Sequence, residues 1–224
     1  MDETTYPAST WSKARRHPER GSHERDEIHA ILDEGLACHV GIVVDGRPVV
    51  IPMAYGRDGD RLLLHGATGS RLVQALASGC AACVTVTLLD GLVVARSAFD
   101  SSMNYRSVVI FGHARRIAGE AERRRALDVL TDHVIPGRTR ELRAPLAREL
   151  AATEVIELVI EEASAKRRSG PPSEPARAAG EPDVWAGVVP LRLAAGDPEP
   201  APDLAPGTVL PESVRQIIRE RGEK

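Results

Sequence analysis

Asp-Gly dipeptides interrupt the apolar runs in the first hundred residues and indicate a β-sheet folded from hairpins. Two-residue hairpin turns favour Asp-Gly, because both central residues take a left-handed conformation. The sequence therefore predicts a meander of antiparallel strands. The dipeptides and the expected strands around them are Asp45-Gly46 between 37–44 and 47–55, Asp58-Gly59 before 61–65, and Asp90-Gly91 between 81–89 and 92–96.

Helical periodicity is confined to short segments around these strands. Residues 24–35 place Ile28, Ile31 and Leu32 on one face and end at a glycine, which predicts a helix. Alternating or continuous apolar residues predict further strands. Six or seven short strands with a few helices favour a mainly β fold with peripheral helices (α+β), either a barrel or a sandwich. The other expected elements are helices at 70–78, 121–133, 140–152 and 211–221, and strands at 107–117 and 153–161.

Composition limits the classes of function. The chain has 224 residues, 42% hydrophobic, and a formal net charge of −3, which gives no electrostatic case for binding nucleic acid or an anionic membrane. No run approaches the roughly 20 apolar residues of a membrane span, and residues 1–27 lack the apolar core of a signal peptide. Cys38, Cys80 and Cys83 sit in apolar contexts without a zinc set, which predicts buried, reduced thiols and no metal site. A cytoplasmic location is expected.

Changes in composition along the chain suggest four segments. Residues 1–23 are polar and are expected to form an extended N-terminal arm, followed by a domain at 24–167. Residues 168–191 form a loop with an apolar island around Trp185 that is expected to dock on the domain, and 192–224 form a Pro/Ala-rich tail.

Two polar segments suggest a phosphate site. The apolar run 61–65 ends in a small, hydroxyl-rich turn that finishes with Ser70 and Arg71, and a polar cluster at 101–107 enters another apolar strand. Hydroxyl, guanidinium and backbone N–H groups, including those at a helix start, bind phosphate. Alternatively, Ser70 is an ordinary helix cap and Arg71 a surface residue.

Three other positions are also open to two interpretations. His65 ends a strand and either hydrogen-bonds a turn or faces a ligand. Trp185 either docks by hydrophobic contact or covers a planar cofactor. Strand alternation places Arg106 and Ser107 on opposite faces, so both reach one site only if a bulge intervenes.

The order of these motifs resembles the flavin mononucleotide (FMN)-binding split barrel of the pyridoxamine 5′-phosphate oxidase superfamily, in particular its branch with the nitroimidazole-resistance (Nim) proteins. The resemblance covers roughly 24–191 and implies a six- to seven-stranded antiparallel split β-barrel of Greek-key type. Its motifs are Cys38-His39-Val40-Gly41, Asp45-Gly46-Arg47-Pro48, Val50-Ile51-Pro52, Leu64-His65-Gly66-Ala67-Thr68-Gly69-Ser70-Arg71, Tyr105-Arg106-Ser107 with the strand that follows, and Trp185-Ala186-Gly187.

The resemblance also implies site residues. The strand matching 49–53 runs along the flavin ring, Ser70 and Arg71 approach the ribityl phosphate, and Ser107 comes from the neighbouring strand, usually across a homodimer interface. His65 lies beside the flavin and is the candidate catalytic residue. The implied cofactor-binding set is Val50, Ile51, Pro52, Met53, His65, Gly66, Ser70, Arg71, Tyr105, Arg106, Ser107 and Trp185.

The expected function is that of an FMN-dependent oxidoreductase, acting as a homodimer on a small molecule, with NAD(P)H as a candidate reductant. The alternative is a storage or sensing module that binds FMN or a related cofactor without turnover. Pyridoxamine 5′-phosphate oxidation itself fits less well. Leu72 stands where the oxidases carry a basic residue, and a Pro/Ala-rich tail replaces their basic C-terminal segment.

Overall fold

A computed structural model of the chain describes residues 4–174 and 183–222. The chain divides into two compact units, which are described separately. Strands β2, β5 and β6 pass from one unit into the other. The first unit comprises Met1–Cys38, Cys83–Phe111 and Glu161–Arg192, and the second comprises His39–Ala82, Gly112–Ile160 and Leu193–Lys224.

The fold is a mainly antiparallel β-sheet with peripheral helices, as the sequence predicts. Within the described residues, six strands form a closed ring of pairings, β6-β7-β4-β3-β2-β5, because β5 also pairs with β6. The strands are β1 (Gly21–Ser22), β2 (Ala37–Val44), β3 (Arg47–Asp58), β4 (Arg61–Ala67), β5 (Ala81–Val94), β6 (Ser102–Arg116), β7 (Thr153–Val159), β8 (Glu162–Arg168) and β9 (Gly187–Pro190). The helices are α1 (Arg25–Glu34), α2 (Arg71–Ala77), α3 (Glu120–Val134), α4 (Ala147–Ala152) and α5 (Glu212–Arg221), with short 3₁₀ turns at Pro18–Arg20 (η1) and Arg138–Glu141 (η2).

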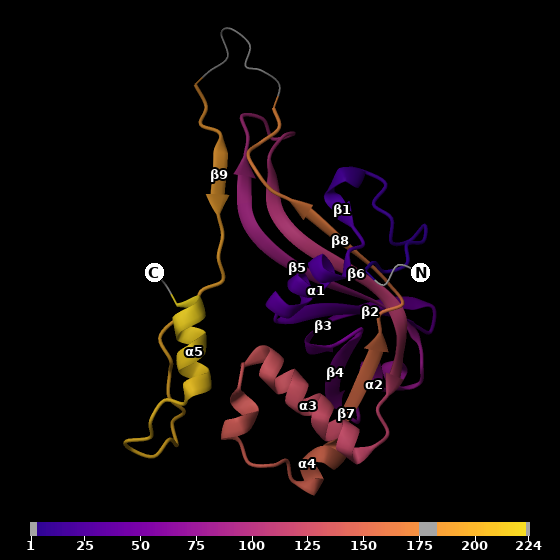
Figure 1. Cartoon of the computed structure of the whole chain (residues 1–224), viewed down its shortest axis with the longest axis vertical. Helices are drawn as coiled ribbons and strands as arrows, with labels where there is room; N and C mark the ends of the chain where they lie inside the picture. Colours follow the sequence, from indigo (N-terminus) through magenta and orange to yellow (C-terminus); the bar gives the residue numbers. More distant parts are fainter. Residues whose placement is uncertain (1–3, 175–182, 223–224) are drawn as a thin grey trace. The chain divides into compact units, whose positions relative to one another are not determined.

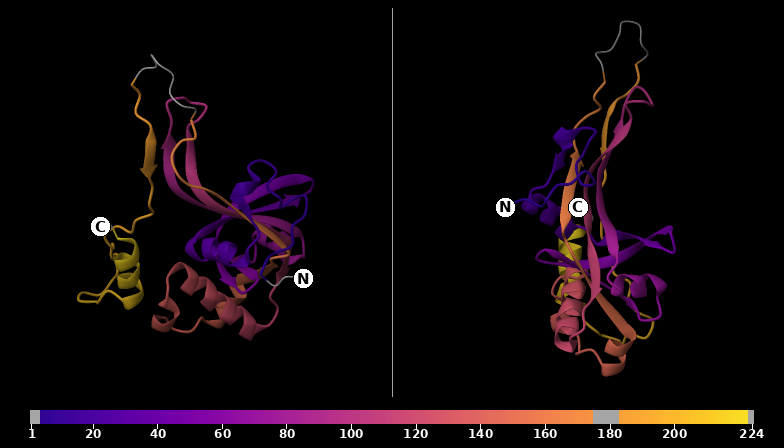
Figure 2. Two further views of the ribbon diagram at one scale, coloured as in Figure 1. Left: turned by 45° about the horizontal axis from the view of Figure 1, so that its top comes forward. Right: turned by 90° about the vertical axis from the view of Figure 1, so that its right-hand side faces the viewer.

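In the first unit, the long strands β5 and β6 run side by side and β8 follows β6 (Figures 1 and 2). The apolar face of α1 supplies Ile28, Ile31 and Leu32 to the core, and this helix packs against β8. The N-terminal segment joins this packing. Tyr6 is 3% exposed, and its hydroxyl lies 2.8 Å from Nε2 of His29.

In the second unit, β4 lies between β3 and β7, and α3 packs against β3 and β4 (Figure 1). Leu62, Leu63 and Leu64 of β4 are fully buried, because the strand has packed neighbours on both faces. One buried cluster joins α3 to the sheet: Leu63, Ile117, Ala126, Leu130 and Val155.

The expected turn at Asp90-Gly91 is wrong, since β5 continues through both residues to Val94. Gly91 pairs with Pro190 of β9, and a Cβ at position 91 would lie 3.0 Å from the carbonyl oxygen of Val189. The glycine therefore permits the close approach of another strand. The pairing joins the strand that follows Trp185 to β5.

Element limits differ from the expectation in three further places. β6 begins at Ser102, before the expected start at 107, and the strand predicted at 153–161 ends at Val159 and is followed by β8, which the sequence did not indicate. The helix expected at 140–152 is divided into η2 and α4. Pro145 lies between them, and proline disfavours helical conformation in the residue before it.

No helix in the described parts of the chain is long and apolar enough to cross a membrane.

Candidate functional site

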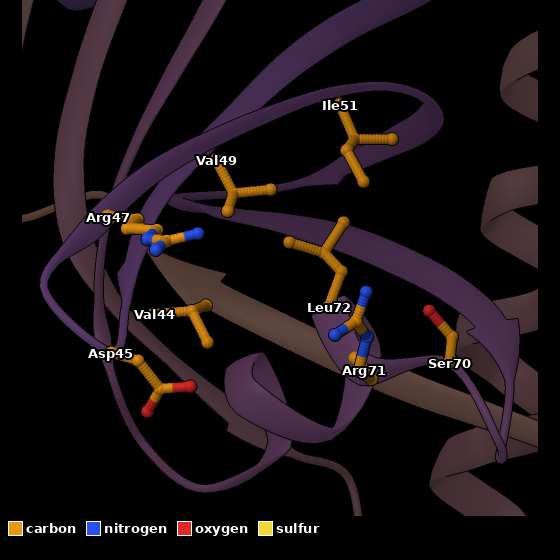
Figure 3. Close-up of a pocket in the computed structure, with 8 residues that line it drawn as sticks. All are labelled: Val44, Asp45, Arg47, Val49, Ile51, Ser70, Arg71 and Leu72. Atoms are coloured by element: carbon orange, nitrogen blue, oxygen red, sulfur yellow. The ribbon is translucent and has the colours of Figure 1, made fainter.

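A pocket of about 700 Å³ opens in the second unit, within the size range of small-molecule sites (Figure 3). Its walls come from the hairpin of β2 and β3 and from the start of α2. The lining residues are Val44, Asp45, Arg47, Val49, Ile51, Ser70, Arg71 and Leu72.

The hairpin turn fixes which side chains of β3 face this pocket. Asp45 and Gly46 both have positive φ, 50° and 74°, as a two-residue type I′ turn requires. Side chains alternate along a strand, so Arg47, Val49 and Ile51 share one face, and all three line the pocket. The turn therefore brings one cation and two apolar side chains to the same wall.

The opposite wall is set by the turn between β4 and α2. The hydroxyl of Ser70 accepts a hydrogen bond from the backbone N–H of Val73 at 3.5 Å, so Ser70 caps the helix. The backbone N–H of Ser70 donates to the carbonyl of Ala67 at 2.9 Å, which closes the turn. The helix also packs closely on β4. A Cβ at Gly66 would lie 2.6 Å from Cγ2 of Val73. These contacts hold Ser70 and Arg71 at the pocket.

The guanidinium groups of Arg47 and Arg71 both line the pocket, and among the described residues neither makes an ion pair or a side-chain hydrogen bond. Several other arginines of the same unit form ion pairs with carboxylates. Arg61, for example, contacts Asp58, Glu122 and Glu157 at 2.6–2.7 Å. The carboxylate of Asp45 is the acidic group in the lining. Cations without carboxylate partners, a hydroxyl and apolar walls suit a phosphate joined to an apolar group.

The structure brings Ile51, Ser70 and Arg71 of the predicted set into this pocket. Val50 and Pro52 alternate with Ile51 on β3, so their side chains point to the other face, where Val50 is 63% exposed. Met53, on the Ile51 face, lies outside the lining.

His65 and Gly66 lie on β4, before the turn, and outside the lining. The register of β4 and β7 places His65 opposite Val155. Surrounding protein atoms remove water from part of the imidazole and lower the pKa of His65 from its ordinary value of 6.5. The ring is therefore largely neutral at neutral pH.

The remaining predicted residues belong to the first unit. Arg106 is already paired, since Nη2 lies 2.8 Å from both Oε1 of Glu34 and Oδ1 of Asp90. The hydroxyl of Ser107 donates to the carbonyl of Lys166 at 3.3 Å. Tyr105 is half-buried in β6, with Arg168 as its strand partner.

Trp185 is 64% exposed and covers Gly187. A Cβ at position 187 would lie 2.9 Å from Cζ2 of the indole, so the glycine leaves room for the ring. In the first unit the tryptophan therefore contacts its own strand, β9.

Arg47 is the cation of the lining that the predicted set leaves out. The sequence analysis included it only in the hairpin motif Asp45-Gly46-Arg47-Pro48. The signal that would have found it is the alternation Arg47, Val49, Ile51, which puts it on the same face as a residue already in the predicted set.

Many solved structures are similar to this chain, among them the following three. The FAD and haem binding protein from Mycobacterium smegmatis is 48% identical, with a TM-score of 0.83, over 88% of this chain and 97% of that one. The flavocytochrome Anf3 from Azotobacter vinelandii is 39% identical, with a TM-score of 0.86, over 93% and 97%. A candidate 5-nitroimidazole antibiotic resistance protein from Bacteroides thetaiotaomicron, 24% identical over 65% and 85% with a TM-score of 0.54, shares the fold.

No curated protein matches the chain. The family described as pyridoxamine 5′-phosphate oxidase matches residues 24–167, more than half of the sequence. The match covers both walls of the pocket, from the β2–β3 hairpin to α2. The chain therefore belongs to the pyridoxamine 5′-phosphate oxidase family.

Proposed function

We propose that the protein binds a flavin and acts in oxidation and reduction of a small molecule. The observation that carries the proposal is the pocket, where the guanidinium of Arg71, without an ion pair among the described residues, and the hydroxyl of Ser70 lie beside apolar walls. These groups fit a flavin, whose phosphate is anionic and whose ring is flat and largely apolar. The flavin names of the two most identical of the structures described above support the same assignment.

The residues have distinct parts in this proposal. Arg71 offers two N–H donors to the phosphate. The turn from Ala67 to Ser70 fixes the backbone position from which the Arg71 side chain extends. Val49 and Ile51 exclude water from the neighbouring wall. His65, kept neutral by its lowered pKa, offers one donor and one acceptor nitrogen to a substrate. The flavin, when bound, supplies the hydride chemistry, which no side chain can perform.

Visible spectroscopy tests the binding claim. The purified protein, or the protein after addition of FMN or FAD, is expected to absorb at about 450 nm, as a bound flavin does. This absorbance should remain after gel filtration. A protein that stays colourless with both flavins would overturn the proposal.

Turnover distinguishes the enzyme from a storage or sensing module. We propose that NAD(P)H is the reductant and that a small molecule, such as a nitro compound or a quinone, is the acceptor. Steady-state NAD(P)H oxidation with a panel of such acceptors should be saturable and flavin-dependent. Flavin binding without any turnover across the panel would favour the storage or sensing function.

We also propose that the working form is a homodimer in which the partner supplies the Ser107 contact. Exposed apolar side chains on β2 and β3, Val43 at 67% and Val50 at 63%, are surfaces that a second copy would cover. A mass measured over a range of concentrations should be that of a dimer. A flavin-loaded monomer at every concentration would exclude it.

Haem binding is a second candidate function, favoured by the names of the M. smegmatis and A. vinelandii proteins. Exposed imidazoles at His39 and His65 in the second unit are of the donor type that ligates haem iron. Haem titration should produce a Soret band that weakens in His39→Ala or His65→Ala. Absence of that band in the wild-type protein would exclude haem binding.

A further inference from the structure

We infer that Arg47 is a specificity-determining residue, which selects a flavin dinucleotide over a mononucleotide by holding a second phosphate. The inference rests on the proposed flavin function and concerns the same pocket. It assigns a role to a side chain at the tip of the β2–β3 hairpin, where the pocket wall opposite α2 begins.

The pocket has two cations that come from different elements. Arg47 is the first residue of β3, and Arg71 is the first residue of α2. Figure 3 shows the two guanidinium groups on separate walls, with Leu72 between them. A single phosphate beside Ser70 is served by Arg71. Arg47 is a second cation across the pocket. Its presence is explained if the ligand carries a second phosphate in addition to the one beside Arg71.

Neither of these two pocket arginines has a carboxylate partner among the described residues. In the described part of the second unit, Arg61, Arg115, Arg116 and Arg125 all form ion pairs of 2.9 Å or less. Asp45 lines the same pocket as Arg47 without forming an ion pair with it among the described residues. Both guanidinium groups therefore keep their hydrogen-bond donors for a ligand.

Asp45 constrains what lies beyond the second phosphate. Its exposed carboxylate accepts hydrogen bonds and repels phosphate oxygens, so a ligand group beside it would be a donor and not an anion. FMN ends at its phosphate and has no such group. A dinucleotide continues through the diphosphate to a ribose with two hydroxyls and to an adenine with an amino group, and both are donors. The order Arg71, Arg47, Asp45 around the pocket thus matches phosphate, phosphate and a polar nucleoside.

Binding constants of both flavins test the inference in the full-length protein. Isothermal titration or flavin-fluorescence quenching should give tighter binding of FAD than of FMN. The Arg47→Gln variant should lose about tenfold or more in FAD affinity and leave FMN affinity nearly unchanged, since one charge-assisted contact is removed from one ligand alone. Arg71→Gln should weaken both. Inorganic diphosphate should displace bound FAD better than inorganic phosphate does, and Arg47→Gln should reduce that advantage.

The matched control is Arg140→Gln, which removes an exposed positive charge from η2 of the same unit and should leave both affinities as they are. If Arg47→Gln leaves FAD affinity unchanged, or weakens FMN and FAD equally, the inference is overturned while flavin binding stands. If the wild-type protein binds neither flavin, the proposed function and this inference both fail.

Discussion

Val73 of α2 packs directly over Gly66 of β4, so that a Cβ at position 66 would lie 2.6 Å from Cγ2 of the valine. This contact allows the helix to pack closely on the strand, and it thereby fixes the positions of Ser70 and Arg71 at the start of α2. The pocket wall formed by Ser70 and Arg71 therefore depends on the absence of a side chain at position 66.

We expect Gly66→Ala to lower the free energy of unfolding by about 1–3 kcal/mol, because the added methyl group overpacks the interface with Val73. Urea unfolding at neutral pH measures the change. Gly69→Ala is the matched control, since nothing lies within 4 Å of a Cβ at position 69. Equal effects of the two substitutions would show that the close approach does not matter.

Arg71→Gln should weaken flavin binding by about 1.5–3 kcal/mol, or roughly tenfold to a hundredfold, because a charge-assisted contact is lost. Ser107→Ala should cost less, since the Ser107 hydroxyl already donates to the carbonyl of Lys166. Titration of each variant with flavin, followed by fluorescence, provides the comparison. An Arg71 variant that binds flavin as tightly as the wild-type protein would show that the phosphate does not bind at Arg71.

Arg106→Gln should act on stability. Glu34 and Asp90 hold the guanidinium and raise its pKa, so we expect a loss of about 1 kcal/mol in unfolding free energy at low salt, in line with partly exposed ion pairs. Flavin affinity should stay within about twofold of the wild type. A large loss of flavin affinity with an unchanged free energy of unfolding would show that Arg106 contacts the cofactor.

Acid should loosen α5 from η2. Hydrogen bonds from the hydroxyl and backbone N–H of Ser213, and the charge of Arg138, lower the pKa of Glu141 from 4.5 to about 2. A carboxyl whose folded pKa is lowered stabilises the fold fully above its unfolded pKa, and this contribution is lost as the pH falls from 4.5 toward about 2. Limited proteolysis at pH 6, 4 and 3, with an acid protease at the lower values, should show increasing cleavage near α5. Ser213→Ala should reduce this pH dependence.

Local sequence signals predicted the elements that local chemistry controls. Asp45 and Gly46 adopt the positive φ values that their hairpin needs, and α1 follows the spacing of Ile28, Ile31 and Leu32. Gly91 could not be interpreted in this way. Its role depends on β9, about a hundred residues later in the chain, and no local pattern encodes that pairing.

The residues of the candidate site could likewise be predicted only where a local pattern indicated them. Ser70 and Arg71 follow from a strand that ends in a hydroxyl-rich turn, and Ile51 from the resemblance to the family. Arg47 required the register of β3 to be known. The neutralisation of Arg106 required the positions of Glu34 and Asp90, which are distant in sequence.

The turn between β2 and β3 has only two residues, Asp45 and Gly46, so its length fixes how the two strands pair. Adding or deleting one residue there would shift the pairing by one position and rotate every side chain of β3 to the opposite face. Pro48, Val50 and Pro52 would then face the cavity in place of Arg47, Val49 and Ile51. The length of this loop therefore determines the lining of the pocket as much as the side chains themselves do.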